Sequence, residues 1–248
     1  MKIVFADATY LKDSVGVISE LVNEARFKFT RDGMELIAMD PANVAMVIFK
    51  LVASVFSEYD LKKDTEIGVN LANFKQILRR AKPSDIVSLE VLEDKKLEIK
   101  FKAGTTRTFS LPLIDLEDRE QRVPSLSFPV NVELPSSVLD DAISDADIVS
   151  ESVSFIAEPN KFWVQAEGDL NKAHTEVWAS DETSIKCDST ARLKAKYSVE
   201  YLKKMMQGGK LAERVSLSFN QDYPLKLEYK IVDRLMLSFI LAPRVEND

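Results

Sequence analysis

The stretch Asn70–Lys82 reads NLANFKQILRRAK, and its counterpart Ser198–Gln207, 128 residues later, reads SVEYLKKMMQ. In both, apolar residues recur at intervals of three and four, the spacing that places them on one face of an α-helix. Gly208-Gly209 follows the second stretch and is typical of a helix end. Two equivalent helices this far apart indicate that the two halves of the chain repeat one structural unit.

Other landmarks repeat at nearly the same distance, with offsets of 126, 128 and 130 residues. The matched segments are Phe27-Lys28-Phe29 with Val153-Ser154-Phe155, Val87-Ser88-Leu89 with Val215-Ser216-Leu217, and Leu111-Pro112-Leu113 with Leu241-Ala242-Pro243. Self-similarity at a fixed spacing is strong evidence of architecture. We therefore predict an α+β fold made by tandem duplication of one helix–hairpin–strand–helix–hairpin unit.

Periodicity predicts the remaining elements of each copy. Helical spacing marks two further helices at Tyr10–Ala25 and Pro135–Val149. Alternating runs around turn residues predict four hairpins: Arg26–Thr30 with Met34–Ala38, Ile86–Leu92 with Leu97–Lys102, Val153–Ala157 with Phe162–Ala166, and Val215–Asn220 with Leu225–Ile231.

The join between the copies lies in Ile114–Pro129, which is charged and then flanked by proline, as expected of an exposed connector. Its late apolar residues Val123, Leu126 and Phe128 are unusual for a plain linker, and they either dock on the body of the protein or await a partner. We expect an N-terminal domain at residues 1–115, a connecting loop at 116–129 and a C-terminal domain at 130–248.

Composition excludes several classes of protein. The 248 residues carry a net charge of −7, and 46% of them are hydrophobic, enough for a folded core. No run of 18 apolar residues is present, so a membrane-spanning helix is excluded, and the acidic, only briefly apolar start argues against a secretory signal. Cys187 is the only cysteine, so no intrachain disulfide can form, and a reducing cytosol is the expected compartment.

The sequence also lacks the usual catalytic motifs. With one histidine, His174, and one cysteine, Cys187, a His/Cys zinc site is impossible, and no signature surrounds either residue to suggest a nucleophile pair. No glycine-rich phosphate loop or nucleophile elbow occurs. We expect no enzyme, cofactor or metal. The rival in the enzyme class is a carboxylate-only metal site at Asp140/Asp141 or Asp181/Glu182.

Positive charge gathers on the two repeated helices of this acidic chain. Lys75, Arg79 and Lys82 fall on one face, opposite Phe74 and Ile77. A surface that faces phosphate would make contacts that are independent of base sequence and sensitive to salt. The candidate phosphate-contacting residues are Lys12, Lys75, Arg79, Arg80, Lys82, Lys203, Lys204 and Lys210.

Four segments closely resemble the sliding clamp family, specifically the archaeal type of proliferating cell nuclear antigen: Gly33–Pro41, Ile67–Leu71, Leu113–Leu116 and Leu241–Glu246. The resemblance runs from Lys2 to Glu246. It implies that three subunits close head to tail into a pseudo-sixfold ring, with sheets outside and helices lining the hole. It also implies that the ring contact joins an edge strand near Thr105–Leu113 to one near Ala173–Ser180 of the next subunit.

The same resemblance implies a clamp that encircles duplex DNA and tethers DNA polymerase, flap endonuclease and ligase through PIP-box peptides (Gln-x-x-aliphatic-x-x-aromatic-aromatic). An ATP-driven clamp loader of the replication factor C type would load it, in the cytoplasm at an archaeal nucleoid. The residues that match the family's peptide pocket are Met39, Asn43, Val44, Met46, Val123, Pro124, Phe128, Pro224, Ile240, Leu241, Ala242 and Pro243.

The sequence departs from the family pattern on the third helix, Pro135–Val149, which carries four aspartates and no basic residue. We therefore expect an uneven channel lining, dominated by the helix at Asn70–Lys82. Two alternatives to a homotrimeric clamp remain open here: a subunit of a heterotrimeric clamp, and a protein-only scaffold that never encircles DNA.

Overall fold

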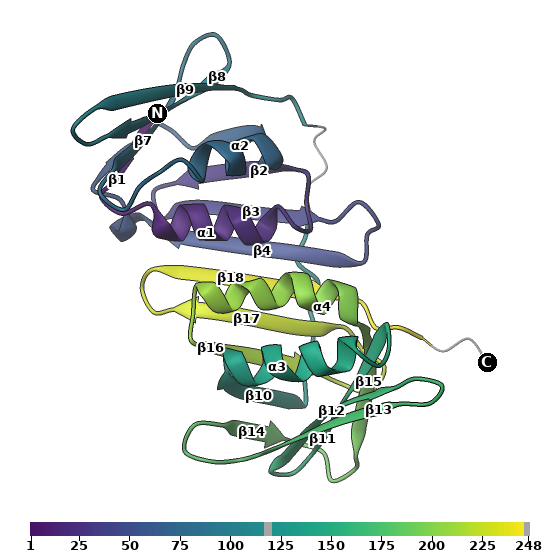
Figure 1. Ribbon diagram of the computed structural model, residues 1–248. Helices are drawn as coiled ribbons and strands as arrows, with labels where there is room; N and C mark the ends of the chain where they lie inside the picture. Colours follow the sequence, from purple (N-terminus) through teal and green to yellow (C-terminus); the bar gives the residue numbers. More distant parts are fainter. Residues whose placement is uncertain (117–120, 246–248) are drawn as a thin grey trace. The chain divides into compact units, whose positions relative to one another are not determined.

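The structure is a computed structural model that describes residues 1–116 and 121–245 (Figure 1). The chain forms two compact units. Unit 1 comprises Met1–Pro41, Val47–Val123 and Ile231–Leu237, and unit 2 comprises Ala42–Met46, Pro124–Lys230 and Ser238–Asp248. Positions 117–120 of the expected connecting loop and Glu246 of the closing motif lie outside the described residues, and the expected division at 115 and 130 stays a prediction.

The predicted duplication is confirmed by the order of elements. Across the described residues, each half of the chain carries a strand, a helix, five strands, a second helix and three strands, in the same succession. Each half therefore has the α+β composition that the matched landmarks predict, and the repeated helices of the opening sequence pair occupy the same place in both.

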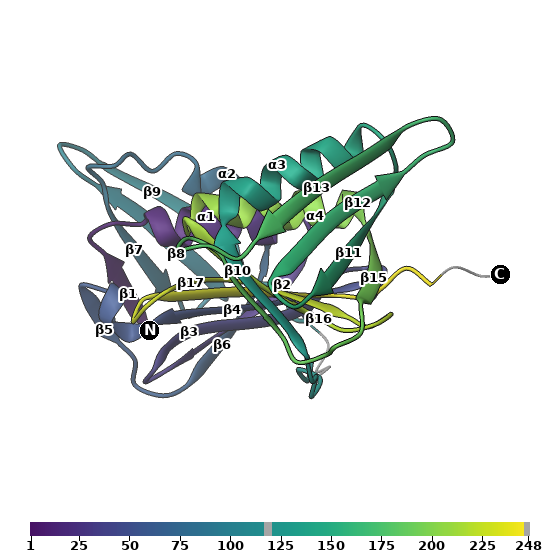
Figure 2. The ribbon, with the colours of Figure 1, turned by 90° about the horizontal axis from the view of Figure 1, so that it is seen from below.

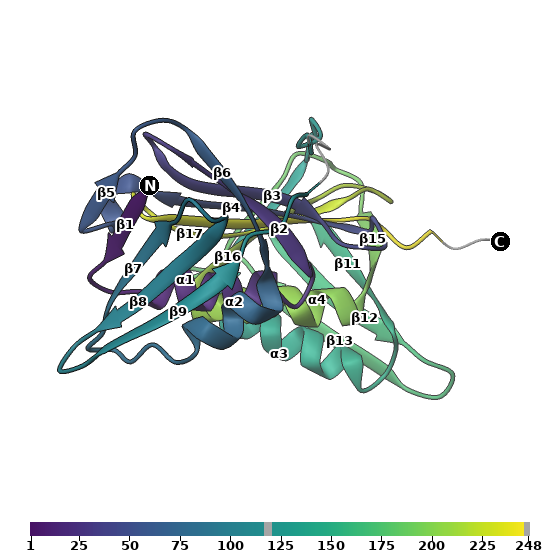
Figure 3. The ribbon, with the colours of Figure 1, turned by 90° about the horizontal axis from the view of Figure 1, so that it is seen from above.

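The first half builds two sheets, with strand orders β5-β1-β7-β8-β9 and β4-β3-β2-β6. Helices α1 and α2 lie side by side on one face of β2, β3 and β4 (Figures 1 and 3). The helices are α1 (Thr9–Ile18) and α2 (Leu71–Leu78), with a 3-10 turn at Ala53–Val55; the strands are β1 (Lys2–Phe5), β2 (Glu24–Thr30), β3 (Gly33–Met39), β4 (Ala45–Val52), β5 (Glu58–Asp60), β6 (Thr65–Asn70), β7 (Ile86–Val91), β8 (Lys96–Lys102) and β9 (Thr106–Pro112).

The second half repeats this plan, with strand orders β13-β12-β11-β15 and β14-β10-β16-β17-β18. Helix α3 contacts strands of both sheets and packs on α4 (Figure 2). The helices are α3 (Ser136–Asp147) and α4 (Val199–Met206), followed by a 3-10 turn at Gln207–Lys210; the strands are β10 (Val130–Pro135), β11 (Ser152–Glu158), β12 (Lys161–Glu167), β13 (Lys172–Trp178), β14 (Ser184–Cys187), β15 (Leu193–Ser198), β16 (Arg214–Phe219), β17 (Leu225–Ile231) and β18 (Leu235–Leu241).

Aromatic side chains anchor the helices and sheets in each core. In unit 1, Phe74 of α2 meets Phe27 of β2 edge to face, with 6.2 Å between the ring centroids. In unit 2, Phe155 contacts the rings of Phe162, Tyr197 and Phe219. Edge-to-face pairs add to the burial of apolar area and restrict how the elements can rotate. These anchors determine which face of α2 is left for solvent.

Two helix ends differ from the sequence prediction. Helix α1 ends at Ile18, whereas the sequence predicted an end at Ala25. The prediction was too long because Leu21 and Val22, which are buried in the turn after the helix, continue the helical spacing of apolar residues. Helix α2 ends at Leu78 rather than Lys82, so Arg79, Arg80 and Lys82 follow the helix. Helix α4 ends at Met206, within one residue of the predicted end, and Gly208 lies in the 3-10 turn that follows, where a Cβ atom would come within 2.4 Å of the Tyr229 ring. That glycine serves close packing.

The two strands expected at the ring contact are both edge strands. Strand β9 is the last in its sheet and β13 is the last in another, and the two share one pattern of exposed and half-buried residues. The Ala103 N–H donates to the Thr105 carbonyl, and the Leu113 N–H donates to the Lys95 carbonyl. Along β9, residues whose backbone groups bond to β8 alternate with residues whose backbone groups point away, and these two bonds determine which residues are which. By that alternation Thr106, Thr108 and Ser110 direct their backbone groups to the open edge.

Candidate functional site

Helix α2 is positioned by a cap and by three buried side chains. The Asn73 N–H donates to the Asn70 side-chain oxygen at 3.0 Å, which satisfies one of the free donors of the first turn. Leu71, Phe74 and Leu78 are buried on the inner face. The chain therefore leaves the helix with Arg79, Arg80 and Lys82 exposed to solvent, and we call these three residues the basic corner.

The basic corner has a fixed backbone because of Asp85, whose side chain is only 3% exposed. Its carboxylate accepts the Lys82 N–H at 2.7 Å and forms an ion pair with Arg107 of β9. Arg107 also donates to the Arg80 carbonyl at 3.0 Å. The Lys82 N–H above all, together with Arg107, lowers the pKa of Asp85. Sequence analysis missed both residues, because neither lies on the helix.

Lys75 does not share the exposure of the basic corner. Its side chain is 17% exposed, and its ammonium donates to Glu20 at 2.5 Å. Glu20 reaches it because α1 ends at Ile18, which leaves Glu20 in the following turn. The uniform stripe expected from Lys75, Arg79 and Lys82 is therefore interrupted. Lys12 of α1 is half-buried.

The cations of α4 and of the 3-10 turn that follows it are paired with acidic or amide groups. Lys203 donates to Asp147 of α3 at 2.6 Å, Lys204 to Glu200 at 2.7 Å, and Lys210 to Gln207 at 2.6 Å. The Lys204 ammonium lowers the pKa of Glu200. Exposed ion pairs such as those of Lys203 and Lys204 contribute little to stability, so these lysines can exchange a carboxylate for a phosphate at little cost. The net positive charge of this surface is nevertheless smaller than that of the basic corner.

Most of the residues matched to the peptide pocket lie in unit 2; only Met39 and Val123 belong to unit 1. Within unit 2, the Ala242 N–H donates to the Val44 carbonyl at 3.0 Å, which brings those two segments together. The Phe128 ring contacts the Tyr223 ring, 6.0 Å between centroids, beside Pro224.

Burial divides the matched residues into two groups. Met46, Ile240 and Leu241 are buried, and Leu241 is only 1% exposed, so these three side chains belong to the core. The residues that reach solvent in whole or part are Met39, Asn43, Val44, Val123, Pro124, Phe128, Pro224, Ala242 and Pro243. Val123 is 46% exposed, so its apolar side chain reaches solvent from the described part of the connecting loop.

His174 and Cys187, which the sequence analysis considered as a possible catalytic pair, lie on different sheets. His174 on β13 contacts Glu176 at 3.2 Å, whereas the Cys187 thiol, on β14 of another sheet, faces the Ser189 carbonyl at 3.5 Å. Among residues 1–116 and 121–245, no group of three or more His, Cys, Asp or Glu side chains is arranged to hold a metal ion. In the same part of the chain, no helix has the length and apolar character needed to span a bilayer.

Comparison with known proteins agrees with this architecture. A family model described as the N-terminal domain of proliferating cell nuclear antigen matches residues 1–120, and one described as its C-terminal domain matches residues 122–244. The chain is 39% identical over 246 residues to "DNA polymerase sliding clamp 1" of Thermococcus kodakarensis and 38% identical over 246 residues to "DNA polymerase sliding clamp" of Pyrococcus furiosus, with 99% of each chain covered.

Two solved structures share the fold. A proliferating cell nuclear antigen from Thermococcus kodakaraensis superposes with a TM-score of 0.91 at 29% identity, covering 98% of this chain and 99% of that one. The complex of PCNA2 and PCNA3 from Sulfolobus tokodaii superposes with a TM-score of 0.88 at 25% identity, covering 99% and 100%. With both domain models matched and full-length relatives near 38% identity, the chain belongs to the proliferating cell nuclear antigen family of DNA polymerase sliding clamps.

Proposed function

We propose that three copies of this chain close into a ring that encircles duplex DNA and holds DNA polymerase at its template. The observation that carries the proposal is the pair of open edges, β9 in the first half and β13 in the second. Unpaired edges are a hazard unless something covers them. A contact between β9 of one copy and β13 of the next is heterologous, and such a contact forms a closed ring when its rotation permits.

The basic corner supports a DNA-facing role. Its three cations are exposed in a chain of net charge −7, and Asp85 and Arg107 hold their backbone in place. Contacts of this type bind phosphates without reading bases, so they let a ring slide. In this proposal the basic corner supplies most of the attraction, Lys203, Lys204 and Lys210 contribute after exchanging their partners, and Lys12 and Lys75 add the least.

We propose further that flap endonuclease, ligase and a clamp loader of the replication factor C type dock by PIP-box peptides at the exposed residues matched to the pocket. Exposed apolar groups such as Val123 suit an aliphatic or aromatic anchor. Tethering raises the local concentration of an enzyme at DNA without a new catalytic contact. The protein itself then acts as a non-catalytic clamp, in the cytoplasm at the nucleoid.

A ring of identical chains is the form we propose. The curated relatives of higher identity are each described as a DNA polymerase sliding clamp, whereas the complex of two different clamp chains matches at 25% identity. The comparisons therefore do not favour the alternative of a heterotrimer subunit.

Retention on circular DNA tests the encirclement directly. The clamp is loaded by an ATP-driven clamp loader on a nicked plasmid, separated from free protein, and then challenged with a restriction enzyme that cuts once. We expect the clamp to stay on the circle and to leave when the plasmid is linear, because topology rather than affinity holds it. Equal retention on both forms would contradict encirclement and support a protein that binds DNA only by affinity.

A further inference from the structure

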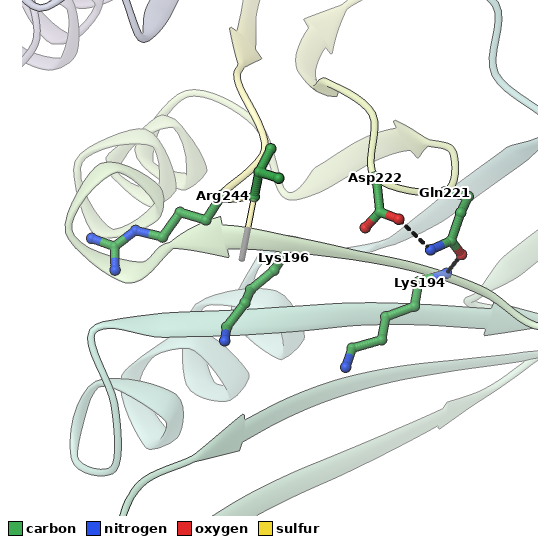
Figure 4. A pocket seen from close by; sticks show the side chains of 6 residues that line it. Lys194, Lys196, Gln221, Asp222 and Arg244 are labelled. Atoms are coloured by element: carbon green, nitrogen blue, oxygen red, sulfur yellow. Dashed lines mark hydrogen bonds between the residues drawn. The ribbon is translucent and has the colours of Figure 1, made fainter. Parts of the chain in front are cut away.

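Unit 2 contains a pocket of about 280 Å³ that the proposed clamp function does not yet use. It is lined by the side chains shown in Figure 4, namely Lys194, Lys196, Gln221, Asp222, Arg244 and Val245. Three of the six residues are cationic and one is anionic. In a chain of net charge −7 such a local excess of positive charge favours an anionic ligand. We call Lys194, Lys196 and Arg244 the basic pocket.

One wall of the basic pocket is fixed by a loop bound to β15. The Lys194 N–H donates to the side-chain oxygen of Gln221 at 2.9 Å, and the Asp222 N–H donates to the Lys194 carbonyl at 3.1 Å. The Gln221 amide donates in turn to the Asp222 carboxylate at 2.6 Å (Figure 4). Through this bond, one oxygen of the Asp222 carboxylate is hydrogen-bonded to Gln221.

The other wall is the segment that leaves β18. There the Arg244 N–H donates to the Lys196 carbonyl at 2.7 Å, which places Arg244 beside β15. Lys194 and Lys196 are two residues apart on that strand, so their side chains leave the same face of the sheet. Backbone hydrogen bonds thus hold the main chain of the three cationic residues around one pocket.

The position of the basic pocket indicates its ligand. Arg244 directly follows Ala242-Pro243, and Asp222 lies two residues before Pro224, all of them matched to the peptide pocket. At 3.8 Å between neighbouring Cα atoms, a peptide seated on these residues reaches the basic pocket within a few of its own positions. The charged ends of Lys194, Lys196 and Arg244 lie apart from one another (Figure 4), so each of them can meet a separate carboxylate of a peptide flank.

We propose that the basic pocket binds acidic side chains in the segment that flanks a partner's PIP-box, so that this clamp prefers partner peptides with an acidic flank. The proposal rests on the proposed function, since it assumes the peptide site. Exposed charge pairs are individually weak, but two or three together give about a fivefold to tenfold preference. The preference should fall with added salt, because the side chains remain in contact with solvent.

The test measures peptide affinity by fluorescence anisotropy with the full-length protein. Three labelled peptides share one PIP-box core: one has Asp and Glu before the core, one has them after it, and one has Asn and Gln in both flanks. We expect one of the acidic peptides to bind about fivefold to tenfold more tightly than the neutral one. The double variant Lys194→Glu with Arg244→Glu should remove that preference and leave the affinity for the neutral peptide within about twofold.

A matched variant controls for net charge. Lys186→Glu with Lys230→Glu makes the same change at exposed lysines outside the pocket, and it should retain the preference. Equal affinity of wild type for all three peptides would overturn the basic-pocket proposal while leaving the peptide site intact. Failure of every peptide to bind would instead contradict the peptide site of the proposed function. Loss of single-stranded oligonucleotide binding in the Lys194/Arg244 variant, with no peptide preference in wild type, would assign the pocket to nucleic acid and also overturn the proposal.

Discussion

The Asp85 carboxylate links the basic corner to Arg107 of β9 through an ion pair, so its contribution to the stability of the folded protein depends on pH. The Lys82 N–H and Arg107 lower its pKa in the folded protein below the usual value of 3.8. A carboxylate with a depressed folded pKa stabilises the protein above the unfolded value, and the stabilisation is lost as the pH falls through the folded pKa.

We therefore predict that Asp85→Asn lowers the melting temperature at pH 7 by roughly 2–4 °C, because asparagine keeps an acceptor but removes the charge. The difference from wild type should shrink as the pH is lowered below about 4. Thermal melts at several pH values between 7 and 3 provide the measurement. A constant difference across that range would show that the carboxylate charge is not the cause.

Alanine substitutions at Leu241 and Val123 distinguish a role in core packing from a role in partner binding. Leu241 is 1% exposed, so Leu241→Ala should cost about 2–5 kcal/mol of unfolding free energy, as expected for a buried leucine. Val123 is 46% exposed, and Val123→Ala should change stability by no more than about 0.5 kcal/mol. Denaturant unfolding measures both values. For Val123→Ala we also expect weaker binding of a PIP-box peptide; unchanged peptide affinity would remove Val123 from the proposed site.

The basic corner predicts which element of the clamp contacts DNA. Charge reversal at Arg79, Arg80 and Lys82 should strongly reduce polymerase stimulation on primed DNA, with the largest loss at low salt, because these exposed cations provide most of the phosphate contact in the proposed ring and salt weakens such contacts. A control with the same charge change, Lys28→Glu with Lys62→Glu and Lys63→Glu, uses exposed lysines elsewhere in unit 1 and should keep its activity. Full stimulation by the basic-corner variant would support the protein-only scaffold.

The four helices and the four hairpins were predictable because their signals are local. The repeated helices and the hairpins follow from spacing within short windows, and the structure confirms them. The end of α1 was not predictable, because Leu21 and Val22 continue the helical spacing while packing from a turn. Pairing of charges was not predictable either: Glu20 neutralises Lys75 across 55 residues of sequence, and Asp147 reaches Lys203 from another helix.

The candidate site was predictable only as a set of residues. The resemblance predicted positions for a peptide pocket, but it could not distinguish buried Leu241 from exposed Val123, because both residues are simply apolar in the sequence. Asp85 and Arg107 carry no motif, and their importance comes from where the loop and β9 bring them. The basic pocket, too, depends on a loop at residues 221–222 meeting β15, a contact with no sequence signal.

Assembly of the ring depends on the open edge of β9. Thr108 directs its backbone N–H outward by the ladder alternation, so Thr108→Pro removes an edge donor without removing a bond to β8. We predict that this variant folds but fails to form trimers. Thr108→Val, which retains the N–H, should assemble normally. Sedimentation velocity distinguishes the species, and a trimeric Thr108→Pro variant would show that β9 is not the contact.

The central claim is that three identical chains form one ring, and the molar mass of the wild-type protein tests it most directly. Light scattering across a dilution series should give 84 kDa, three times the chain mass of 28.0 kDa, down to concentrations at which the subunits dissociate. A mass of 28 kDa at every concentration would contradict a homotrimer, and it would direct the search to other chains that complete the ring.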